Sequence, residues 1–241
     1  FGAFAQEKNY VTTQVSIDQE IQGTLLSPKK QNNTPLAILI AGSGPTNRDG
    51  NQAHLKNNSL KYLAEGLAEK EISVFRYDKR IIAQMNKGTD KLTFEDGVND
   101  ALLVVNYFKK KYKNIIIIGH SEGALIGILV AQKTPVSKLI SLSGAGSNSA
   151  TLIEEQIKKN APQLKEEAQK VLNLLKKGEQ VDNISPYLAP VFRKSVQPYL
   201  ISWFKYDPTK EITKIKIPVF IIQGTNDLQV ERKEAQLLKE A

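Results

Sequence analysis

The sequence predicts an α/β fold in which helices cover both faces of a mostly parallel sheet. Three observations predict it. Short apolar runs rich in β-branched residues recur along the 241 residues, segments with helical spacing separate them, and the isoleucine run 115–118 passes through a glycine-flanked turn into an apolar helix. Strands that alternate with helices are typical of a mostly parallel sheet. The length fits one domain of this type with an insertion.

The first elements are a hairpin, a buried strand and a helix. Residues 10–17 and 22–27 alternate and carry β-branched side chains, which predicts an antiparallel hairpin. Residues 35–41 form a continuous apolar strand that ends in Gly42-Ser43-Gly44-Pro45. Apolar residues at helical spacing predict a helix over residues 59–70.

The second half of the sheet continues the alternation. Residues 72–77 and 115–118 are strands on either side of a long amphipathic helix over residues 94–112. An apolar helix over residues 122–132 follows the isoleucine strand. The last predicted elements are the strands 136–142 and 219–223 and a helix over residues 232–240.

Residues 147–215 interrupt this alternation. Residues 151–160 and 164–177 are charged and helical, and prolines and aromatic residues follow them. Because loops of this length without secondary structure are uncommon in compact domains, we expect a helical insertion. Ligands in open parallel sheets bind beyond the carboxyl ends of the strands, which favours a lid with an aromatic face over a helical decoration on the sheet edge. The aromatic residues are Tyr187, Phe192, Tyr199, Trp203, Phe204 and Tyr206.

The junction after the isoleucine strand reads Gly119-His120-Ser121-Glu122-Gly123, a G-x-S-x-G pattern. A strand that turns sharply into a helix crowds its backbone, and glycines two positions either side of the serine leave room for the turn. The pattern alone has low specificity, but its strand–turn–helix setting favours Ser121 as a nucleophile. The alternative is a glycine-lined turn with an incidental serine.

Composition excludes several classes of function. The net charge of +8 comes from scattered lysines without interleaved aromatic residues or a nucleic-acid-binding motif, so we expect no nucleic-acid partner. The absence of cysteine excludes disulfides, thiolate metal sites and a cysteine nucleophile. No apolar run approaches the roughly 18–20 residues of a membrane span. Nothing in the sequence indicates a metal ion or an organic cofactor.

The first residues, Phe1-Gly2-Ala3-Phe4-Ala5-Gln6, are unusual for a mature domain. Ala3-Phe4-Ala5 fits the small-x-small site of signal peptidase, which predicts that residues 1–5 are the end of a signal peptide and that the protein is periplasmic or secreted. The alternative is a short native or vector-derived stretch on a cytoplasmic protein.

Two further motifs complete a resemblance to the α/β-hydrolases over essentially the whole chain. Residues 41–50, A-G-S-G-P-T-N-R-D-G, are similar to the G-S-G-P-x-D-R-D-G loop of bacterial esterases in the serine-aminopeptidase-like, S33-type group. Residues 76–80, R-Y-D-K-R, are similar to the R-Y-D-K-R-G-x-G segment of that group. Two departures are visible: Asn47 replaces an aspartate, and residues 81–83, Ile-Ile-Ala, replace the glycine-containing continuation.

The resemblance implies a site for hydrolysis of small carboxylic esters, or of peptides by the same mechanism. It implies that backbone N–H groups of Glu122 and of Ser43 or Gly44 form an oxyanion hole, although Gly42–Pro45 also fits a simple tight turn. We further expect an ion-pair network that stiffens the oxyanion loop. Its members are Arg48, Asp49, Asp78 and Arg80.

The resemblance also places the acid of a catalytic triad at Asp227, in the Gly-x-x-Asp turn after strand 219–223, with capping of the next helix as the alternative. Neither histidine of the sequence is a good candidate for the base of the triad. His120 lies inside the elbow, where we expect it to pack structurally, and His54 follows the oxyanion strand. The family's histidine follows one more strand, beyond residue 241. The sequence thus predicts a hydrolase core at residues 6–146 and 216–241, a lid at 147–215, and a missing last strand and histidine loop.

Three explanations of the missing base are open: an omitted C-terminal segment, a shortened chain, or natural loss of the base. Loss of the last strand would leave an exposed sheet edge, which natural proteins avoid, so the first two are favoured and the chain as written is expected to be nearly inactive. The alternative function is a non-catalytic protein that keeps the pocket and binds a small molecule.

Overall fold

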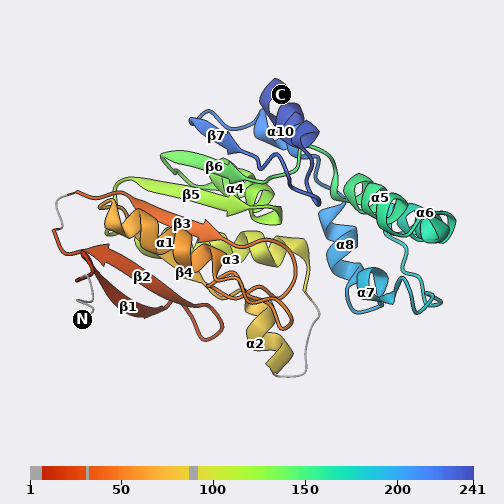
Figure 1. The fold of residues 1–241 in the computed structure, drawn as a ribbon, viewed down its shortest axis with the longest axis horizontal. Helices are drawn as coiled ribbons and strands as arrows, with labels where there is room; N and C mark the ends of the chain where they lie inside the picture. Colours follow the sequence, from red (N-terminus) through yellow and green to blue (C-terminus); the bar gives the residue numbers. More distant parts are fainter. Residues whose placement is uncertain (1–6, 31–32, 87–91) are drawn as a thin grey trace, which may run out of the picture.

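The computed structural model describes residues 7–30, 33–86 and 92–241, and a seven-stranded sheet forms its centre (Figure 1). The expected signal-peptide remnant lies outside these residues. The strand order is β1-β2-β4-β3-β5-β6-β7, in which β1–β2 and β2–β4 are antiparallel and all other pairs are parallel. The strands are β1 (Tyr10–Ser16), β2 (Gln22–Pro28), β3 (Leu36–Ile40), β4 (Ser73–Tyr77), β5 (Ile115–His120), β6 (Lys138–Leu142) and β7 (Val219–Ile222). The predicted hairpin and mostly parallel sheet are confirmed.

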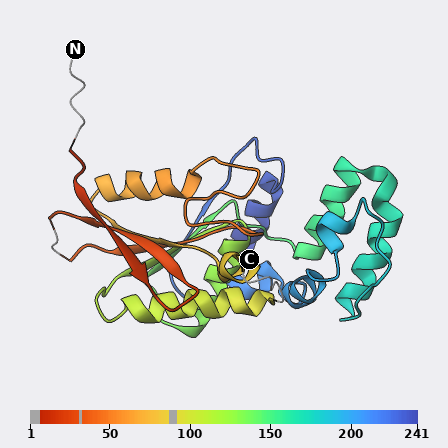
Figure 2. The same ribbon diagram turned by 90° about the horizontal axis from the view of Figure 1, so that it is seen from below.

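Helices cover both faces of the sheet (Figure 2). Helix α1 (Ser59–Glu69) packs on one face through Leu60, Ala64 and Ala68, which recur at the four-residue spacing of a helical stripe. Helices α3 (Phe94–Phe108) and α4 (Glu122–Lys133) pack on the opposite face. Helix α10 (Arg232–Glu240) packs next to β7. This arrangement leaves the carboxyl ends of the parallel strands open for a site.

A short helix, α2 (Arg80–Asn86), follows β4 and was not predicted. It covers the segment in which Ile81 and Ala83 stand where the family motif has glycines. Because glycine costs about 1 kcal/mol in a helix relative to alanine, the replacement of glycine removes the main obstacle to helix formation here. The departure from the family motif therefore has a local structural consequence.

Residues 147–215 are largely helical, as predicted, and most of them form a lobe at the end of the molecule opposite β1 (Figure 1). Its helices are α5 (Ser149–Asn160), α6 (Lys165–Lys176), α7 (Ala189–Phe192), α8 (Gln197–Trp203) and α9 (Pro208–Ile212). Prolines stand in the first turns of α7, α8 and α9, where their missing N–H has no helical partner to lose. Helices α5 to α8 share an apolar core of their own that includes Leu172, Leu175 and Phe192. Its function as a lid stays a prediction.

The sheet ends at β7, which pairs only with β6 among the described residues. Phe220 of β7 is 62% exposed, as expected of a strand at the edge of a sheet. In the described part of the chain, no helix is long and apolar enough to cross a membrane. The same residues contain no group of three or more histidine, aspartate or glutamate side chains that could hold a metal ion.

Candidate active site

Ser121 stands in a strained backbone conformation between β5 and α4, with φ 53° and ψ −120°. Non-glycine residues rarely adopt such angles, and in native proteins they cluster at functional sites. The strain is maintained from both sides, because the N–H of Ser121 donates to the Leu142 carbonyl (2.9 Å) and its carbonyl accepts from the N–H of Ala124 (2.9 Å). The predicted sharp turn is therefore present.

The flanking glycines are sterically required. A Cβ atom at Gly119 would lie 2.1 Å from the carbonyl oxygen of Gly123. A Cβ atom at Gly123 would lie 2.4 Å from the carbonyl oxygen of Ile40, at the end of β3. These contacts are far shorter than van der Waals contact, so the G-x-S-x-G pattern reflects close packing of α4 against β3.

The loop after β3 lies directly against the serine. A Cβ atom at Gly42 would be 3.3 Å from the Cβ of Ser121, and Gly44 has a positive φ of 77°. The Ser43 carbonyl is the anchor of this loop, because it accepts hydrogen bonds from Thr46 Oγ1 (3.1 Å) and Gln52 Nε2 (3.0 Å). The anchoring by Gln52 was not predicted, since no local sequence signal marks it.

Two backbone N–H groups without an acceptor lie in the segments that meet at Ser121. In the described part of the chain, the N–H groups of Ser43 and Glu122 donate to no other residue. Glu122 begins α4, where the first N–H groups of a helix have no internal acceptor. Both N–H groups are therefore available to bind an acceptor oxygen of a ligand.

An ion pair between Lys79 and Glu122 lies beside the loop. Lys79 Nζ is 2.9 Å from Glu122 Oε1 and 3.0 Å from the carbonyl oxygen of Gly42. The Glu122 side chain is fully buried and that of Lys79 is 15% exposed. Sequence reasoning missed these contacts of Lys79, although Lys79 belongs to the R-Y-D-K-R motif that indicated the family resemblance.

The ion-pair network that we expected among Arg48, Asp49, Asp78 and Arg80 is not present as a single network. Arg48 pairs with Asp78, its Nε lying 2.9 Å from Asp78 Oδ2. Asp49 pairs instead with Arg76 of β4, at 3.0 Å. Arg48 and Asp49 lie in the segment after Gly42–Pro45, so these two pairs connect that segment to β4 and to the residue that follows it.

Arg80 belongs to a separate cluster, so the predicted four-residue network is wrong in its connectivity. Arg80 contacts Asp100 of α3 (2.6 Å) and two acidic residues of the β1–β2 turn, Asp18 (3.2 Å) and Glu20 (2.6 Å). The physical reason is geometric, because Arg80 begins α2 and its side chain extends toward α3 and the turn. Burial raises the pKa of Asp100, although its contact with Arg80 opposes that shift.

Asp227 lies in the turn after β7, as predicted. Its Oδ1 accepts from the backbone N–H groups of Gln229 (2.9 Å) and Val230 (3.0 Å), and its Oδ2 accepts from Gln223 Nε2 (3.1 Å). Partial burial raises the pKa of Asp227, but these hydrogen bonds outweigh burial and hold the pKa below its usual range. The alternative to the triad function was capping of the next helix, but α10 begins only at Arg232. The alternative is therefore stabilisation of the turn by the Asp227 carboxylate.

Neither histidine lines the cavity beside Ser121. His54 is exposed in the loop between β3 and α1. The ring of His120 packs against Gly42, where an added Cβ atom would lie 3.1 Å from Nδ1 of the ring. Removal of the ring from water lowers the pKa of His120, and the nearby Asp227 carboxylate partly opposes the shift. The contact of the ring with Gly42 agrees with the structural packing that we expected of His120. Another part of the residue is exposed at the surface.

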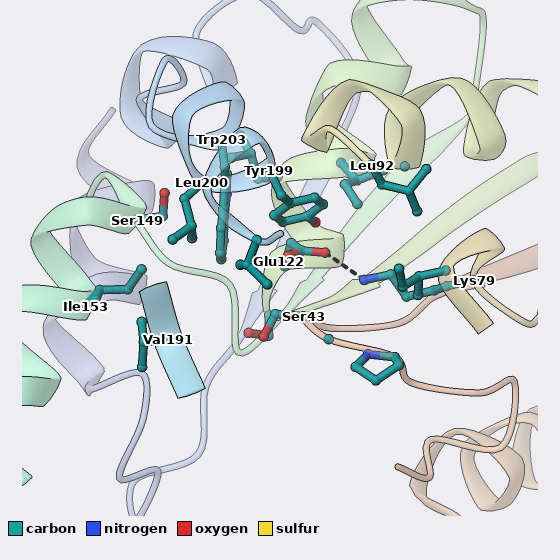
Figure 3. A pocket seen from close by; sticks show the side chains of 18 of the residues that line it. Ser43, Lys79, Leu92, Glu122, Ser149, Ile153, Val191, Tyr199, Leu200 and Trp203 are labelled. Atoms are coloured by element: carbon teal, nitrogen blue, oxygen red, sulfur yellow. Dashed lines mark hydrogen bonds and ion pairs between the residues drawn. The ribbon is translucent and has the colours of Figure 1, made fainter. Parts of the chain in front are cut away.

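A cavity of about 530 Å³ opens next to Ser121, between the ends of the strands and the helical lobe. Figure 3 shows Tyr199, Leu200 and Trp203 of α8 on one side, with Ile153 and Val191 on another and the Lys79–Glu122 pair near Ser43. Burial, reinforced by the Glu122 carboxylate, raises the pKa of Tyr199 well above its ordinary value, so the phenol is neutral. Of the six aromatic residues expected on the inner face of the insertion, only Tyr199 and Trp203 line the cavity.

The other four aromatic residues of the insertion lie elsewhere. Phe192 and Phe204 are buried in the core of the lobe, and Tyr187 is 80% exposed. Tyr206 packs on Phe94 at the start of α3. The predicted aromatic face thus consists of two residues only, because Phe192 and Phe204 belong to the core of the lobe, Tyr206 contacts α3 and Tyr187 faces solvent.

The fold and the elbow are those of an α/β-hydrolase. The esterase Pf2001 of Pyrococcus furiosus superposes with a TM-score of 0.60 at 16% identity, over 96% of this chain and 76% of that chain. A lipase-esterase related protein of Clostridium acetobutylicum superposes with a TM-score of 0.56 at 18% identity, over 92% of this chain and 86% of that one. At these identities the likeness establishes the fold alone.

Sequence similarity defines the family more narrowly. The serine aminopeptidase S33 family matches residues 53–202, and the chain belongs to this family. Esterase EstD of Thermotoga maritima is 26% identical over 233 residues, which is 91% of this chain and 53% of that protein. The chain thus spans about half the length of this curated relative.

Proposed function

We propose that this protein is a serine hydrolase that cleaves carboxylic esters through an acyl-enzyme intermediate. The observation that carries the proposal is the strained Ser121 at the wall of an apolar cavity, facing the loop after β3. The strain of this backbone persists because packing at Gly119 and Gly123 imposes it. A residue that the fold holds in such a conformation beside a cavity is a strong candidate for a reacting group.

The proposed chemistry assigns a function to each group around Ser121. Its Oγ attacks the ester carbonyl carbon while a base takes the hydroxyl proton, and the carbonyl oxygen becomes negatively charged. The N–H of Glu122 and that of Ser43, with Gly44 as the alternative second donor, bind this oxygen. Such preorganised donors contribute about 2.7–4 kcal/mol each to stabilisation of the transition state. Collapse of the intermediate expels the alcohol, and water then hydrolyses the acyl-enzyme.

Asp227 is the proposed acid of the triad, which orients the base and stabilises its charged form. Its lowered pKa supports this function, because the group stays ionised at neutral pH. Neither histidine lines the cavity, so we assign the function of base to neither of them. Activity of the proposed kind therefore requires a base other than His54 and His120.

The substrate is proposed to be a small-molecule ester. The family resemblance predicts small acyl groups, but a cavity of about 530 Å³ lies within the 300–1,000 Å³ typical of sites for much larger ligands. Most side chains around it are apolar. We propose that the acyl chain lies in this cavity under α8, so that chains longer than acetyl are accepted.

The test is hydrolysis of p-nitrophenyl esters of graded chain length by the full-length protein and its Ser121→Ala variant. We expect the variant to lose at least about 10³-fold in kcat, because the nucleophile is gone. An unchanged rate in Ser121→Ala would refute the serine mechanism. An optimum at acetate would refute the proposed use of the whole cavity, and hydrolysis of aminoacyl p-nitroanilides would favour a peptidase.

A second candidate function is that of a non-catalytic binding protein, which the placement of both histidines favours. Labelling with a p-nitrophenyl alkylphosphonate separates the two candidates. A serine hydrolase becomes modified at Ser121 within minutes at stoichiometric concentration, whereas a binding protein with an inert serine stays unmodified. Mass spectrometry of the intact protein and of the peptide that contains Ser121 gives the result.

A further inference from the structure

The buried pair of Lys79 and Glu122 connects the two segments that carry the proposed oxyanion donors. Lys79 follows β4, Gly42 follows β3, and Glu122 begins α4, so three separate elements meet at one ammonium group. Lys79 Nζ donates to Glu122 Oε1 at 2.9 Å and to the Gly42 carbonyl at 3.0 Å (Figure 3).

This pair is costly to bury. Removal of two charges from water carries a penalty of several kcal/mol per ion, which the attraction offsets only with good geometry. Here the compensation is incomplete, because Glu122 Oε2 is buried without a hydrogen-bond partner among the described residues. Replacement of such a pair by well-packed apolar residues is often neutral or stabilising, so stability alone does not account for the pair.

The contact with Gly42 has a direct consequence for Ser43. The carbonyl of Gly42 and the N–H of Ser43 belong to the same planar peptide unit, and in a trans peptide the two groups point in opposite directions. A donor that holds the carbonyl therefore sets the direction of the N–H. The ammonium also polarises the peptide, which strengthens the Ser43 N–H as a donor.

The contact with Glu122 acts on the second donor. The side chain of Glu122 is bound to Lys79, and its backbone N–H follows directly on Ser121. One cation thus contacts the Glu122 side chain and the peptide unit that joins Gly42 to Ser43, and these two residues, Ser43 and Glu122, carry the proposed donors. We propose that Lys79 is a positioning residue that sets the relative orientation of the Ser43 and Glu122 N–H groups, an inference that rests on the proposed function of these groups as an oxyanion hole.

The kinetic test uses Lys79→Met, which keeps the length of the side chain and removes the charge and all donors. We expect kcat for p-nitrophenyl esters to fall about 10- to 100-fold with KM within threefold, because misplaced donors weaken transition-state stabilisation. Lys79→Arg is expected to recover part of kcat, since it restores charge but not the two-contact geometry. Lys8→Met, which removes the exposed pair with Glu65, is the matched control.

A double variant separates positioning from stability. Lys79→Met leaves the Glu122 carboxylate buried without a counter-ion and lowers the melting temperature, and Lys79→Met/Glu122→Gln removes that unpaired charge. We expect the double variant to regain most of the melting temperature but not kcat. If kcat returned together with the melting temperature, the pair would be structural only and the proposal would be overturned.

Amide hydrogen exchange gives a readout that does not depend on activity. The N–H of Thr46 donates to the Gly44 carbonyl (2.9 Å) and that of Asn47 to the Asn51 carbonyl (2.9 Å), so both report on the oxyanion loop. We expect at least tenfold faster exchange of these amides in the double variant than in the wild type. Unchanged exchange would overturn the inference. Absence of ester hydrolysis in the wild type would refute the proposed function instead, and the exchange result would still decide whether Lys79 holds the loop.

Discussion

At the scale of single residues, Asp227 has two functions that the structure allows and that mutation can separate. Its Oδ1 stabilises a turn by accepting the N–H groups of Gln229 and Val230, and its carboxylate charge is the property that a triad acid needs. Asparagine keeps an oxygen acceptor for the turn but lacks the charge. The two functions therefore predict different results for the same substitution.

For Asp227→Asn in the full-length protein, we expect kcat to fall by about 10³-fold or more while the melting temperature changes by only a few degrees. Asp227→Ala is the control, because it removes the turn acceptor as well and should lower both quantities. A kcat within tenfold of the wild type in Asp227→Asn would leave Asp227 with its turn function alone. Steady-state kinetics and thermal denaturation measure the two effects.

The pH dependence of stability follows from the same group. The folded-state pKa of Asp227 is lowered, so its carboxylate contributes stability that is present above the unfolded pKa of about 3.9 and is lost as pH falls through the folded value. The acid limb of the stability curve should therefore be less steep below about pH 4 in Asp227→Asn than in the wild type. Urea denaturation at several pH values measures this slope.

At the scale of elements, the junction of β5 and α4 has a strict steric requirement for glycine. The turn brings α4 against β3 so closely that a Cβ atom at Gly123 meets the Ile40 carbonyl at 2.4 Å. Helix α4 is buried on nearly all sides, between the sheet, α3 and α9. A displaced α4 would therefore move Ser121 and disturb the core at the same time.

For Gly123→Ala we expect loss of soluble folded protein, or a loss of unfolding free energy above about 3 kcal/mol, because backbone atoms must move to admit the methyl group. Gly66→Ala on α1 is the matched control, since a Cβ atom there meets nothing within 4 Å. That control should gain about 0.5–1 kcal/mol, because glycine is unfavourable inside a helix. Equal stability of the two variants, measured by urea denaturation, would contradict the steric argument.

At the scale of the whole molecule, residues 147–215 contact the hydrolase core at three places: α8 packs on α3, α9 packs on α4, and α5 is paired with the start of α10 through Glu155 and Lys233. The buried N–H of Phe94 donates to Ser202 Oγ at 2.7 Å, and the Phe94 ring stacks on Trp203 with 5.8 Å between centroids. The lobe otherwise has its own apolar core. The separate apolar core of α5 to α8 is the observation that supports the interpretation of the lobe as a separate unit.

For Ser202→Ala we expect a loss of about 1–3 kcal/mol in unfolding free energy, because the Phe94 N–H is left buried and unpaired. If the lobe undocks before the core unfolds, limited proteolysis should first cut within residues 147–215 and leave the rest intact. Ser195→Ala, on the α7–α8 connection, is the control and should stay at wild-type stability. A single cooperative loss of the whole chain would contradict a separable lobe.

Much of the architecture was predictable from the sequence because it depends on local periodicity. All seven strands, the amphipathic α1 and α3 and the apolar α4 appeared as hydrophobic patterns of period two or near 3.6. Helix α2 was missed because its seven residues are too few for a periodic signal, and a family motif suggested a glycine loop there. The four-residue α7 and five-residue α9 were invisible for the same reason.

By itself, the sequence determined the fold class, the elbow around Ser121, the loop at Gly42–Pro45 and the turn at Asp227, since each is written in neighbouring residues whose spacing reflects backbone geometry. Only the tertiary structure decided which distant side chains meet. Lys79 contacts Glu122 and Gly42. Arg80 pairs with Asp100 instead of joining Arg48 and Asp49 in one network. Two of the six aromatic residues line the cavity. Such contacts depend on how elements far apart in the chain pack together, and no local pattern records that packing.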